Sequence, residues 1–377
     1  VGDKGEVTLE GTDFVSARFF PDARLNVVDT LLAGAPEDEV LVGIDEAGNR
    51  RSWSRGELRA DVAAAAQSMR DAGVGIGDRV AAWTPNVPET VVWALAALSI
   101  GAVVSTASTD FAAQGVLDRF GQIEPVLLLV AAEYRYGGKE FDLRGEATAA
   151  LTELPSVRQV VVLGEPSASW TTSAMSWQAW LAGSRGAELQ TVPLAFDHPG
   201  FILFSSGTTG APKCIVHSAA GVLLKDLAEQ RVHLDIRAGD RVCYFTTCGW
   251  MMWNWLVMAL GTQATVVLYD GQPMFPEADR LLGLVADEEL TFLGVSAKYI
   301  EALREKECSE HPDRCRACER SRAPGPPWRR SCSNTSTNPS TRRSTSRRSP
   351  AAPTSADVLF SAYPPSRSTP GRSKARP

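Results

Sequence analysis

The sequence predicts an α/β fold in which mostly parallel sheets are flanked by helices. Strand-like and helix-like runs alternate along residues 39–306, and such alternation is typical of β-α-β units. Two short apolar runs, residues 126–130 and 159–163, suit strands that are buried on both faces of a parallel sheet. The 377-residue chain is 44% hydrophobic and 22% charged, which is ordinary for a globular protein.

The alternation begins with a strand over residues 39–44 and a helix that follows Ser54. Ser54 and Glu57 have the spacing of a capping box, apolar residues of 58–69 share one helical face, and Gly73 ends the helix. The next predicted elements are strands over 78–83, 102–105, 126–130 and 159–163, and helices over 87–100 and 114–121.

The second half of the chain continues the same rhythm. It predicts strands over 201–204, 241–245, 265–268 and 291–293, and helices over 219–232, 250–260, 276–287 and 297–306. Asp78 and Asp240 each stand in G-D-R before a strand and are expected to cap the approach to it. In sheets of this kind ligands bind beyond the carboxyl ends of the strands.

The sharpest motif is F-I-L-F-S-S-G-T-T-G-A-P-K over residues 201–213, where a buried strand leads into a loop of hydroxyl and glycine residues. Glycines let main-chain N–H groups approach an anion, the hydroxyls donate, and Lys213 adds positive charge, so the loop suits a polyphosphate. It is not a Walker A loop, because Pro212 precedes the lysine and Cys214 follows it. The alternative is a solvated turn rich in Ser and Thr. The candidate phosphate-binding residues are Ser205, Ser206, Gly207, Thr208, Thr209, Gly210 and Lys213.

The run S-S-G-T-T-G-x-P-K resembles the phosphate-binding signature of the adenylate-forming acyl-CoA synthetase family. This resemblance implies that the loop embraces the pyrophosphate end of ATP while a carboxylate attacks the α-phosphorus. The acyl-adenylate then reacts with the thiol of CoA and releases AMP. ATP, CoA and Mg²⁺ are therefore expected, with Lys213 and Thr208 as candidate catalytic residues. For Lys213 the alternative is a surface lysine at the end of the loop.

Other stretches resemble one branch of this family. Phe20–Asn26 resembles the F-P-x-A-R-L-N of acetyl-, propionyl- and acetoacetyl-CoA synthetases, and residues 115–125, 213–217 and 245–255 resemble the acetoacetyl-CoA synthetases in particular. The resemblance covers about residues 15–306. It implies an acid–thiol ligase that makes acetoacetyl-CoA from acetoacetate and so belongs to lipid and ketone-body metabolism. The rival interpretation is a ligase for acetate or propionate.

The tryptophan-rich stretch after residue 245 supplies the candidate substrate-binding residues. By resemblance, Gly249, Trp250 and Met251 line the acyl pocket, and a bulky Trp would shorten it to fit a small acid. Trp253 and Trp255 are expected to be core aromatics. His217 is expected to be structural, no residue is assigned as a metal ligand, and Cys214, Cys243 and Cys248 are expected to be buried thiols.

The charge of the chain is divided sharply. Residues 1–307 carry a net charge of −16 and residues 308–377 one of +10, and this tail holds 11 of the 23 Pro and four of the seven Cys. The tail could be a basic arm that binds nucleic acid. Cys308, His311, Cys315 and Cys318 superficially suggest zinc ligation. Neither interpretation accounts for the near absence of apolar periodicity.

A third interpretation is that residues beyond about 307 are read out of frame. When GC-rich codons for residues 349–355 are read two bases later they encode S-G-G-T-D-V, which resembles the second nucleotide-binding motif of the family. The same shift turns residues 332–338 and 371–377 into F-E-Y-V-Y-E and E-I-Q-G-P-A, and the change of frame would lie between Lys306 and Trp328.

This interpretation sets the expected domains. Residues 1–307 would be a partial AMP-binding domain, residues 308–377 a disordered basic tail, and the small carboxy-terminal domain of the family would be absent. The residues that the second nucleotide-binding motif and the carboxy-terminal domain place around the reacting phosphorus would be missing. We therefore expect a truncated, largely inactive and poorly soluble product.

The cellular setting follows from what the sequence lacks. The amino terminus shows no signal peptide, and no apolar run reaches the about 20 residues that a membrane-spanning helix needs. We expect a cytoplasmic protein whose partners are acetoacetate, ATP and CoA, with no membrane partner. A nucleic-acid partner is disfavoured by the acidic body, and the oligomeric state is left open.

Overall fold

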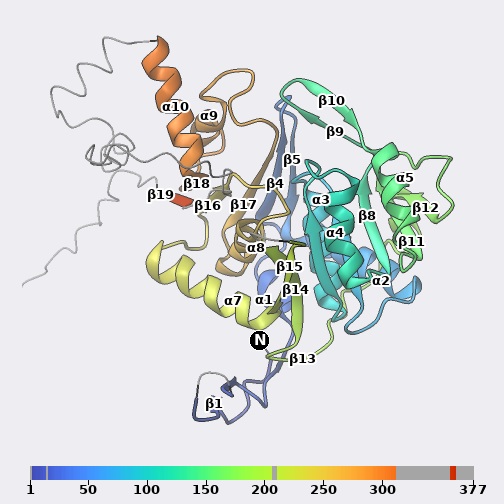
Figure 1. Cartoon of the computed structure of the whole chain (residues 1–377). Coiled ribbons are helices and arrows are strands. Elements are labelled where there is room, and N and C mark those ends of the chain that lie inside the picture. The colour runs from blue at the N-terminus through green and yellow to red at the C-terminus, as the bar shows by residue number, and fades with distance from the viewer. Residues whose placement is uncertain (1, 14–15, 206–209, 311–356, 362–377) are drawn as a thin grey trace, which may run out of the picture.

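Two large β-sheets with helices between and outside them form the molecule (Figure 1). The structure is a computed structural model that describes residues 2–13, 16–205, 210–310 and 357–361. Most strand pairs in both sheets are parallel. The predicted α/β class, with mostly parallel sheets flanked by helices, is confirmed.

The first sheet has seven strands and carries the candidate loop at one edge. Its last two strands, β14 and β15, pair antiparallel, whereas the other neighbours are parallel. Across the sheet the strands are β12 (Ser173–Ser176), β11 (Gln159–Leu163), β8 (Leu127–Ala131), β6 (Arg79–Trp83), β7 (Val103–Ala107), β14 (Pro199–Ser205) and β15 (Lys213–Ser218).

The second sheet combines strands from both ends of the chain. Its order across the sheet is β19 (Asp357–Ser361), β18 (Phe292–Ser296), β16 (Arg241–Tyr244), β17 (Thr265–Asp270), β4 (Glu39–Asp45) and β5 (Arg50–Ser54). The pair of β4 and β17 is parallel and pairs Leu41 with Val266. The β4–β5 strands therefore join the rest of this sheet through contacts between residues far apart in the sequence.

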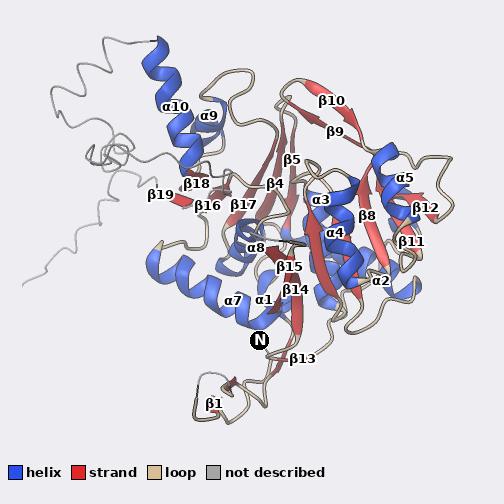
Figure 2. Cartoon of the chain, in the orientation of Figure 1, coloured by secondary structure: helices blue, strands red, loops and turns tan. Residues whose placement is uncertain are grey.

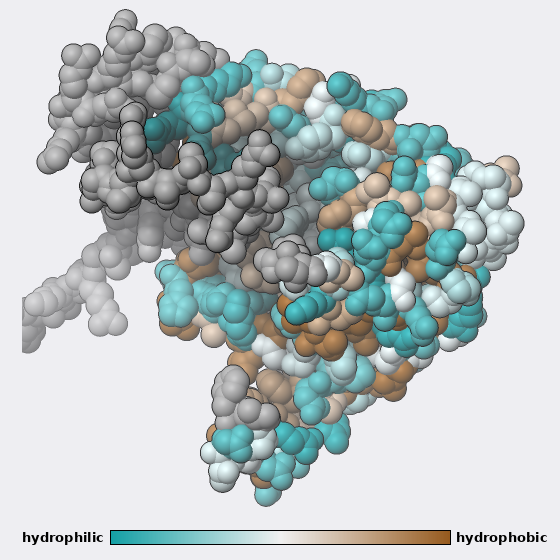
Figure 3. Space-filling view, viewed as in Figure 1, coloured by the Kyte–Doolittle hydropathy of each residue, from teal (hydrophilic) through white to brown (hydrophobic). Residues whose placement is uncertain are grey.

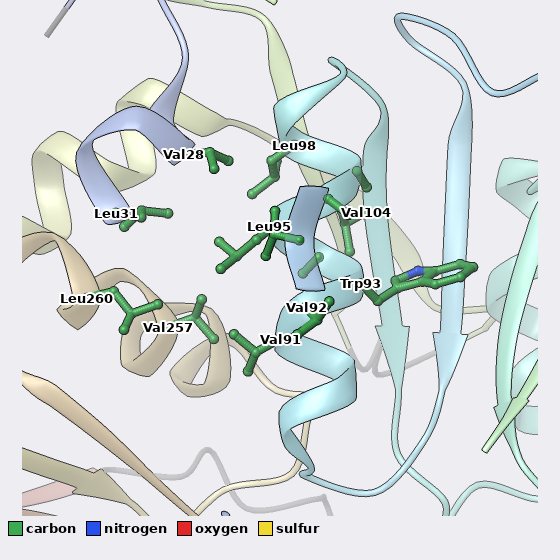
Figure 4. Close-up of a cluster of buried hydrophobic side chains, with 14 of the residues drawn as sticks. Val28, Leu31, Val91, Val92, Trp93, Leu95, Leu98, Val104, Val257 and Leu260 are labelled. Atoms are coloured by element: carbon green, nitrogen blue, oxygen red, sulfur yellow. The ribbon is translucent and has the colours of Figure 1, made fainter. Parts of the chain in front are cut away.

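Helices form a central layer between the sheets (Figure 2). This layer contains α1 (Val27–Leu31), α2 (Arg55–Asp71), α3 (Pro88–Ser99), α7 (Ala219–Ala228) and α8 (Met251–Met258). Helix α3 is buried on nearly every side and contacts β4 of one sheet and β6 and β7 of the other. Figure 4 shows Leu95 and Leu98 of α3 directed toward Val28 of α1, and Val91 toward Val257 of α8.

The outer faces of the sheets are covered separately. Helices α4 (Ala113–Ile123) and α5 (Arg144–Thr152) cover the seven-stranded sheet. Helices α9 (Arg280–Asp287) and α10 (Ala297–Glu310) cover the six-stranded sheet. The face seen in Figure 3 mixes hydrophilic and hydrophobic residues where it is coloured. The remaining elements are α6 (Trp177–Ala182), the two hairpin strands β9 (Glu133–Tyr136) and β10 (Lys139–Asp142), and the short strands β1 (Leu9–Glu10), β2 (Arg18–Phe19), β3 (Arg24–Leu25) and β13 (Leu194–Ala195).

Local predictions hold in several places and fail at some boundaries. The capping box of Ser54 and Glu57 is present, and the Asp78 and Asp240 carboxylates accept turn N–H groups as expected. The predicted helix over 219–232 is wrong at its end, because a π-helical turn, η1 (Glu229–His233), follows α7. The helix over 250–260 likewise ends in a 3-10 turn, η2 (Ala259–Thr262), and the helix over 276–287 begins only at Arg280.

Candidate functional site

The candidate phosphate loop joins two paired strands. Ser205 ends β14, Lys213 begins β15, and the two residues face each other in the antiparallel register. Ser206, Gly207, Thr208 and Thr209 lie outside the described residues. At Gly210 a Cβ atom would meet no heavy atom within 4 Å. The hairpin therefore brings the first hydroxyl and the only lysine of the predicted set to the same place.

Lys213 is exposed and is at the edge of the sheet. Within the described part of the chain its ammonium group forms no salt bridge with a carboxylate. An unpaired ammonium group beside a hairpin of hydroxyl residues can neutralise an anion without first breaking an existing pair.

The loop after β16 is held tightly against the seven-stranded sheet. The hydroxyl of Thr106 donates to the carbonyl of Cys248. The Cys248 thiol donates to the carbonyl of Thr84 at 2.9 Å. At Gly249 a Cβ atom would come within 3.0 Å of the main-chain nitrogen of Ser108. Only glycine fits this contact without a shift of the loop.

The three predicted acyl-pocket residues have different surroundings. Gly249 packs on Ser108 as described, and Trp250 is 56% exposed. Met251 begins α8 and lines a cavity of about 480 Å³. Trp253 and Trp255 are buried in the central core, as the sequence predicted. The structure thus brings Met251, but neither Gly249 nor Trp250, into the wall of this cavity.

This cavity lies between the β14–β15 hairpin and helices α7 and α8, and we call it the hairpin cavity. Its lining is mostly apolar, with polar groups from α7 and α8 and from the end of β15. The lining residues are Phe201, Leu203, Val216, His217, Ser218, Gly221, Val222, Lys225, Asp226, Met251 and Asn254. A largely apolar cavity with a few polar groups is the usual form of a small-molecule site.

The charged groups of the hairpin cavity come from α7. The ammonium group of Lys225 lies 3.3 Å from a carboxylate oxygen of Asp226 and 2.8 Å from one of Glu229. Burial raises the pKa of the Asp226 carboxyl to about 6, and the Lys225 ammonium opposes that rise. Burial and the same ammonium lower the pKa of His217. Because Lys225 already balances the two carboxylates, it is not free to bind the carboxylate of a substrate.

One buried polar atom of the hairpin cavity has no partner. Asn254 is only 4% exposed, and its Oδ1 makes no hydrogen bond. The sequence analysis missed this residue, and it also missed Lys225 and Asp226. The available signal was a polar residue inside an apolar helix, as in M-M-W-N-W-L-V-M for Asn254.

A second cavity, of about 490 Å³, lies beyond the carboxyl ends of β4, β8 and β17. Its polar groups are largely paired: Arg51 and Glu89 form a salt bridge at 2.5 Å. Burial raises the pKa of Asp270 to about 7, although a hydrogen bond from the Asn86 main chain opposes this. No described residue in its wall has a buried polar side-chain atom without a partner. Unlike the hairpin cavity, it therefore offers no buried, unpartnered side-chain atom to a ligand.

Metal and membrane features are limited within the described residues. No group of three or more His, Cys, Asp or Glu side chains there could hold a metal ion. None of the helices in those same ranges combines the length and hydropathy needed to cross a bilayer. The three cysteines and the histidine that suggested zinc lie beyond Lys306, where no side chain is described.

One thiol prediction is wrong. Cys243 and Cys248 are buried, but Cys214 is exposed. Cys214 lies on β15, an edge strand that is exposed along most of its length, and its Sγ lies 3.5 Å from Oε1 of Gln122.

Comparisons with known proteins agree on one family. The family model described as AMP-binding enzyme matches residues 29–359. The acetoacetyl-coenzyme A synthetase of Rhizobium meliloti (strain 1021) is 45% identical over 310 residues, which are 81% of this chain and 47% of that protein. The acetoacetyl-CoA synthetase of Xenopus tropicalis is 40% identical over 308 residues, which are 78% of this chain and 46% of that protein.

A solved structure gives the same picture. The acetoacetyl-CoA synthetase from Streptomyces lividans matches with a TM-score of 0.75 and 39% identity, over 81% of this chain and 47% of that one. The chain thus spans about half the length of the relatives it matches.

Proposed function

Because this chain belongs to the AMP-binding enzyme family, we propose that its function is that of an ATP-dependent acid–thiol ligase whose acid substrate is acetoacetate. The reaction joins acetoacetate to CoA through an acyl-adenylate and releases AMP and pyrophosphate. The observation that carries the proposal is the β14–β15 hairpin, which pairs Ser205 with Lys213 at the end of a parallel sheet. The hairpin cavity, of about 480 Å³, lies beside it.

The loop would position the phosphate groups of ATP and neutralise their negative charge. Ser205, Gly210 and Lys213, with the residues between Ser205 and Gly210, would hold the phosphate groups of ATP through hydroxyl and main-chain N–H donors. Lys213 would balance the charge that builds up as pyrophosphate leaves. Met251, with Gly249 and Trp250 before it, would contact the acyl group. Mg²⁺ is expected from the family resemblance and would neutralise phosphate charge when ATP is bound.

Acetoacetate is favoured over acetate and propionate by the relatives. The two relatives and the solved structure described above are all acetoacetyl-CoA synthetases. A nucleic-acid-binding function would depend on the basic tail, and nothing in the described residues favours it. Cytoplasmic location follows the same proposal and carries no separate support.

We also propose the domain division drawn from the sequence. Residues 1–307 would form a partial AMP-binding domain, and residues 308–377 would be an out-of-frame tail. The described structure carries α10 to Glu310 and places β19 within the tail. Resequencing codons 300–330 from genomic DNA tests the proposal: restored bases should reopen a frame that reads S-G-G-T-D-V. An unchanged sequence would contradict a sequencing error and indicate a pseudogene.

The function is tested by acid-dependent exchange of pyrophosphate into ATP, which requires adenylation but not CoA. The assay uses the 377-residue chain and the product of the frame-corrected gene, with acetoacetate, acetate and propionate. We expect exchange with acetoacetate by the corrected product and little by the shorter chain. Lys213→Met should lower the exchange rate by about 10²-fold, whereas Lys4→Met, at an exposed lysine outside both cavities, should not.

The outcomes separate the parts of the proposal. Exchange with acetate or propionate but not acetoacetate would contradict the substrate. If the corrected product exchanges pyrophosphate with none of the three acids, the ligase activity itself is contradicted. Robust exchange by the 377-residue chain would contradict only the expectation that this chain is largely inactive.

A further inference from the structure

Asn254 occupies an unusual position in the hairpin cavity. It lies one helical turn beyond Met251 on α8, and both residues line the cavity. Met251 is 45% exposed, whereas Asn254 is 4% exposed. The two residues therefore mark the mouth and the inner end of the same wall.

The neighbours of Asn254 have their polar groups satisfied. The indole nitrogen of Trp253 donates to Oδ1 of Asn86 at 3.0 Å. The carbonyl of Trp255 accepts from the side chain of Gln230 at 2.8 Å. The Oδ1 of Asn254 has no such partner. A buried amide without a partner destabilises a fold, and a leucine of similar shape would avoid the penalty, so packing alone does not explain the asparagine.

We infer that Asn254 is a specificity-determining residue that recognises a second polar group on the acid substrate, an inference that rests on the proposed function. The group would be an oxygen on the third carbon of a short carboxylic acid. The amide of Asn254 donates through its nitrogen and accepts through its oxygen, and a half-turn about its last side-chain bond exchanges the two. It can therefore meet an oxo group as a donor or a hydroxyl as an acceptor.

The arrangement of charges sets the direction of the acid. Asp226 and Lys225 form a salt bridge at the α7 side of the cavity, so that side disfavours the carboxylate of a substrate. The carboxylate would instead point toward Ser205 and Lys213. Leu203 in the cavity wall is two residues from Ser205, about 7 Å along the strand. The far end of a short acid would then reach the inner wall at Asn254.

A second buried amide provides a matched control. Gln230 is fully buried at the contact of η1 with α8, and its Oε1 also lacks a partner. Gln230 does not line the hairpin cavity. Each substitution removes a buried amide on α8 or against it, but only the loss of Asn254 should change the choice of acid.

The test compares acetoacetate with butyrate, which has the same carbon skeleton but no oxygen on the third carbon. Dissociation constants are measured on the 377-residue chain by saturation-transfer NMR of the ligand methyl groups. We expect acetoacetate to bind at least about 10-fold more tightly than butyrate. Asn254→Leu should reduce this ratio to about one, and Gln230→Leu should leave it unchanged. Asn254→Ala, which removes the amide without adding bulk, should also lose the preference for acetoacetate and covers the case in which the leucine variant does not fold.

The outcomes for this inference differ from those for the ligase. A preference that survives Asn254→Leu, or a wild-type chain without any preference, overturns the inference. If Asn254→Leu does not fold, a preference that survives in Asn254→Ala overturns it. A further outcome is that the acid preference depends on Asn254 while the frame-corrected protein fails to exchange pyrophosphate with any of the three acids. That pair of results supports the inference and contradicts the ligase function.

Discussion

At the scale of single residues, Gly249 fixes the loop that carries Trp250 and Met251. A Cβ atom there would lie 3.0 Å from the main-chain nitrogen of Ser108, which directly follows β7. We expect Gly249→Ala to lower the free energy of unfolding by about 1–3 kcal/mol, measured by urea denaturation. Gly121→Ala is the control, because that helical glycine has nothing within 4 Å and alanine there should stabilise by up to about 1 kcal/mol. Equal effects of the two substitutions would contradict the close contact.

Asp226 gives a prediction about pH. Its pKa is raised to about 6 from 3.8, so the folded state binds this proton more tightly than the unfolded state. The stability that the protonated carboxyl contributes is complete below about pH 4 and is lost as pH rises through about 6. The free energy of unfolding of the wild type, relative to Asp226→Asn, should therefore fall by about 1–3 kcal/mol between pH 4 and pH 7. Asp118→Asn, at an exposed aspartate of α4, should show no such trend.

The site was predictable from the sequence only in part, and particular residues show why. The hydroxyl and glycine run that begins at Ser205 has a composition that points to an anion whatever the fold. Asn254 and Asp226 are single polar residues in apolar helices, and their meaning depends on whether a partner lies nearby. That is decided by the packing of α7 against α8, which no local pattern specifies. Cys214 was predicted wrongly for the same reason, since its burial depends on β15 being an edge strand.

At the scale of elements, helix α2 depends on its amino-terminal cap. The Ser54 hydroxyl accepts from the main chain of Glu57, and the Glu57 carboxylate accepts from the main chain of Ser54. Ser54→Ala should lower the free energy of unfolding by about 1 kcal/mol, seen as a lower midpoint in urea. Ser54→Asp keeps an acceptor at this position and should lose much less. An unchanged midpoint for Ser54→Ala would contradict the role of the cap.

Elements with strong apolar periodicity were predictable, and those formed by pairing were not. Strands β6, β8 and β11 are recognisable because they are buried on both faces and are apolar after their first residue. Strand β15 is exposed along most of its length, and it is a strand only because β14 is its partner. The β9–β10 hairpin is mostly polar and exposed for the same reason. Such strands are specified by pairing with the next strand of a hairpin and not by apolar periodicity of their own residues.

At the scale of the whole molecule, β15 forms an exposed edge of the seven-stranded sheet. Ile215 and Val216 on this edge are 43% and 57% exposed, and such edges pair with other chains. Ile215→Lys should slow aggregation of the 377-residue chain, measured as the rise of light scattering at fixed concentration. Val232→Lys is the control, because Val232 is 75% exposed on η1 and not on a strand. A larger effect at Val232 than at Ile215 would indicate general surface hydropathy as the cause.

The pairing of β4 with β17 also governs when the fold can form during synthesis. Leu41 leaves the ribosome about 225 residues before its partner Val266. At 5–20 residues per second this interval is on the order of 10 to 50 s. Throughout that time the apolar residues of β4 have one neighbour in their final sheet, β5, and no second one. Until Val266 is made, the edge of β4 that will face β17 stays unpaired, so the six-stranded sheet can be completed only late in synthesis.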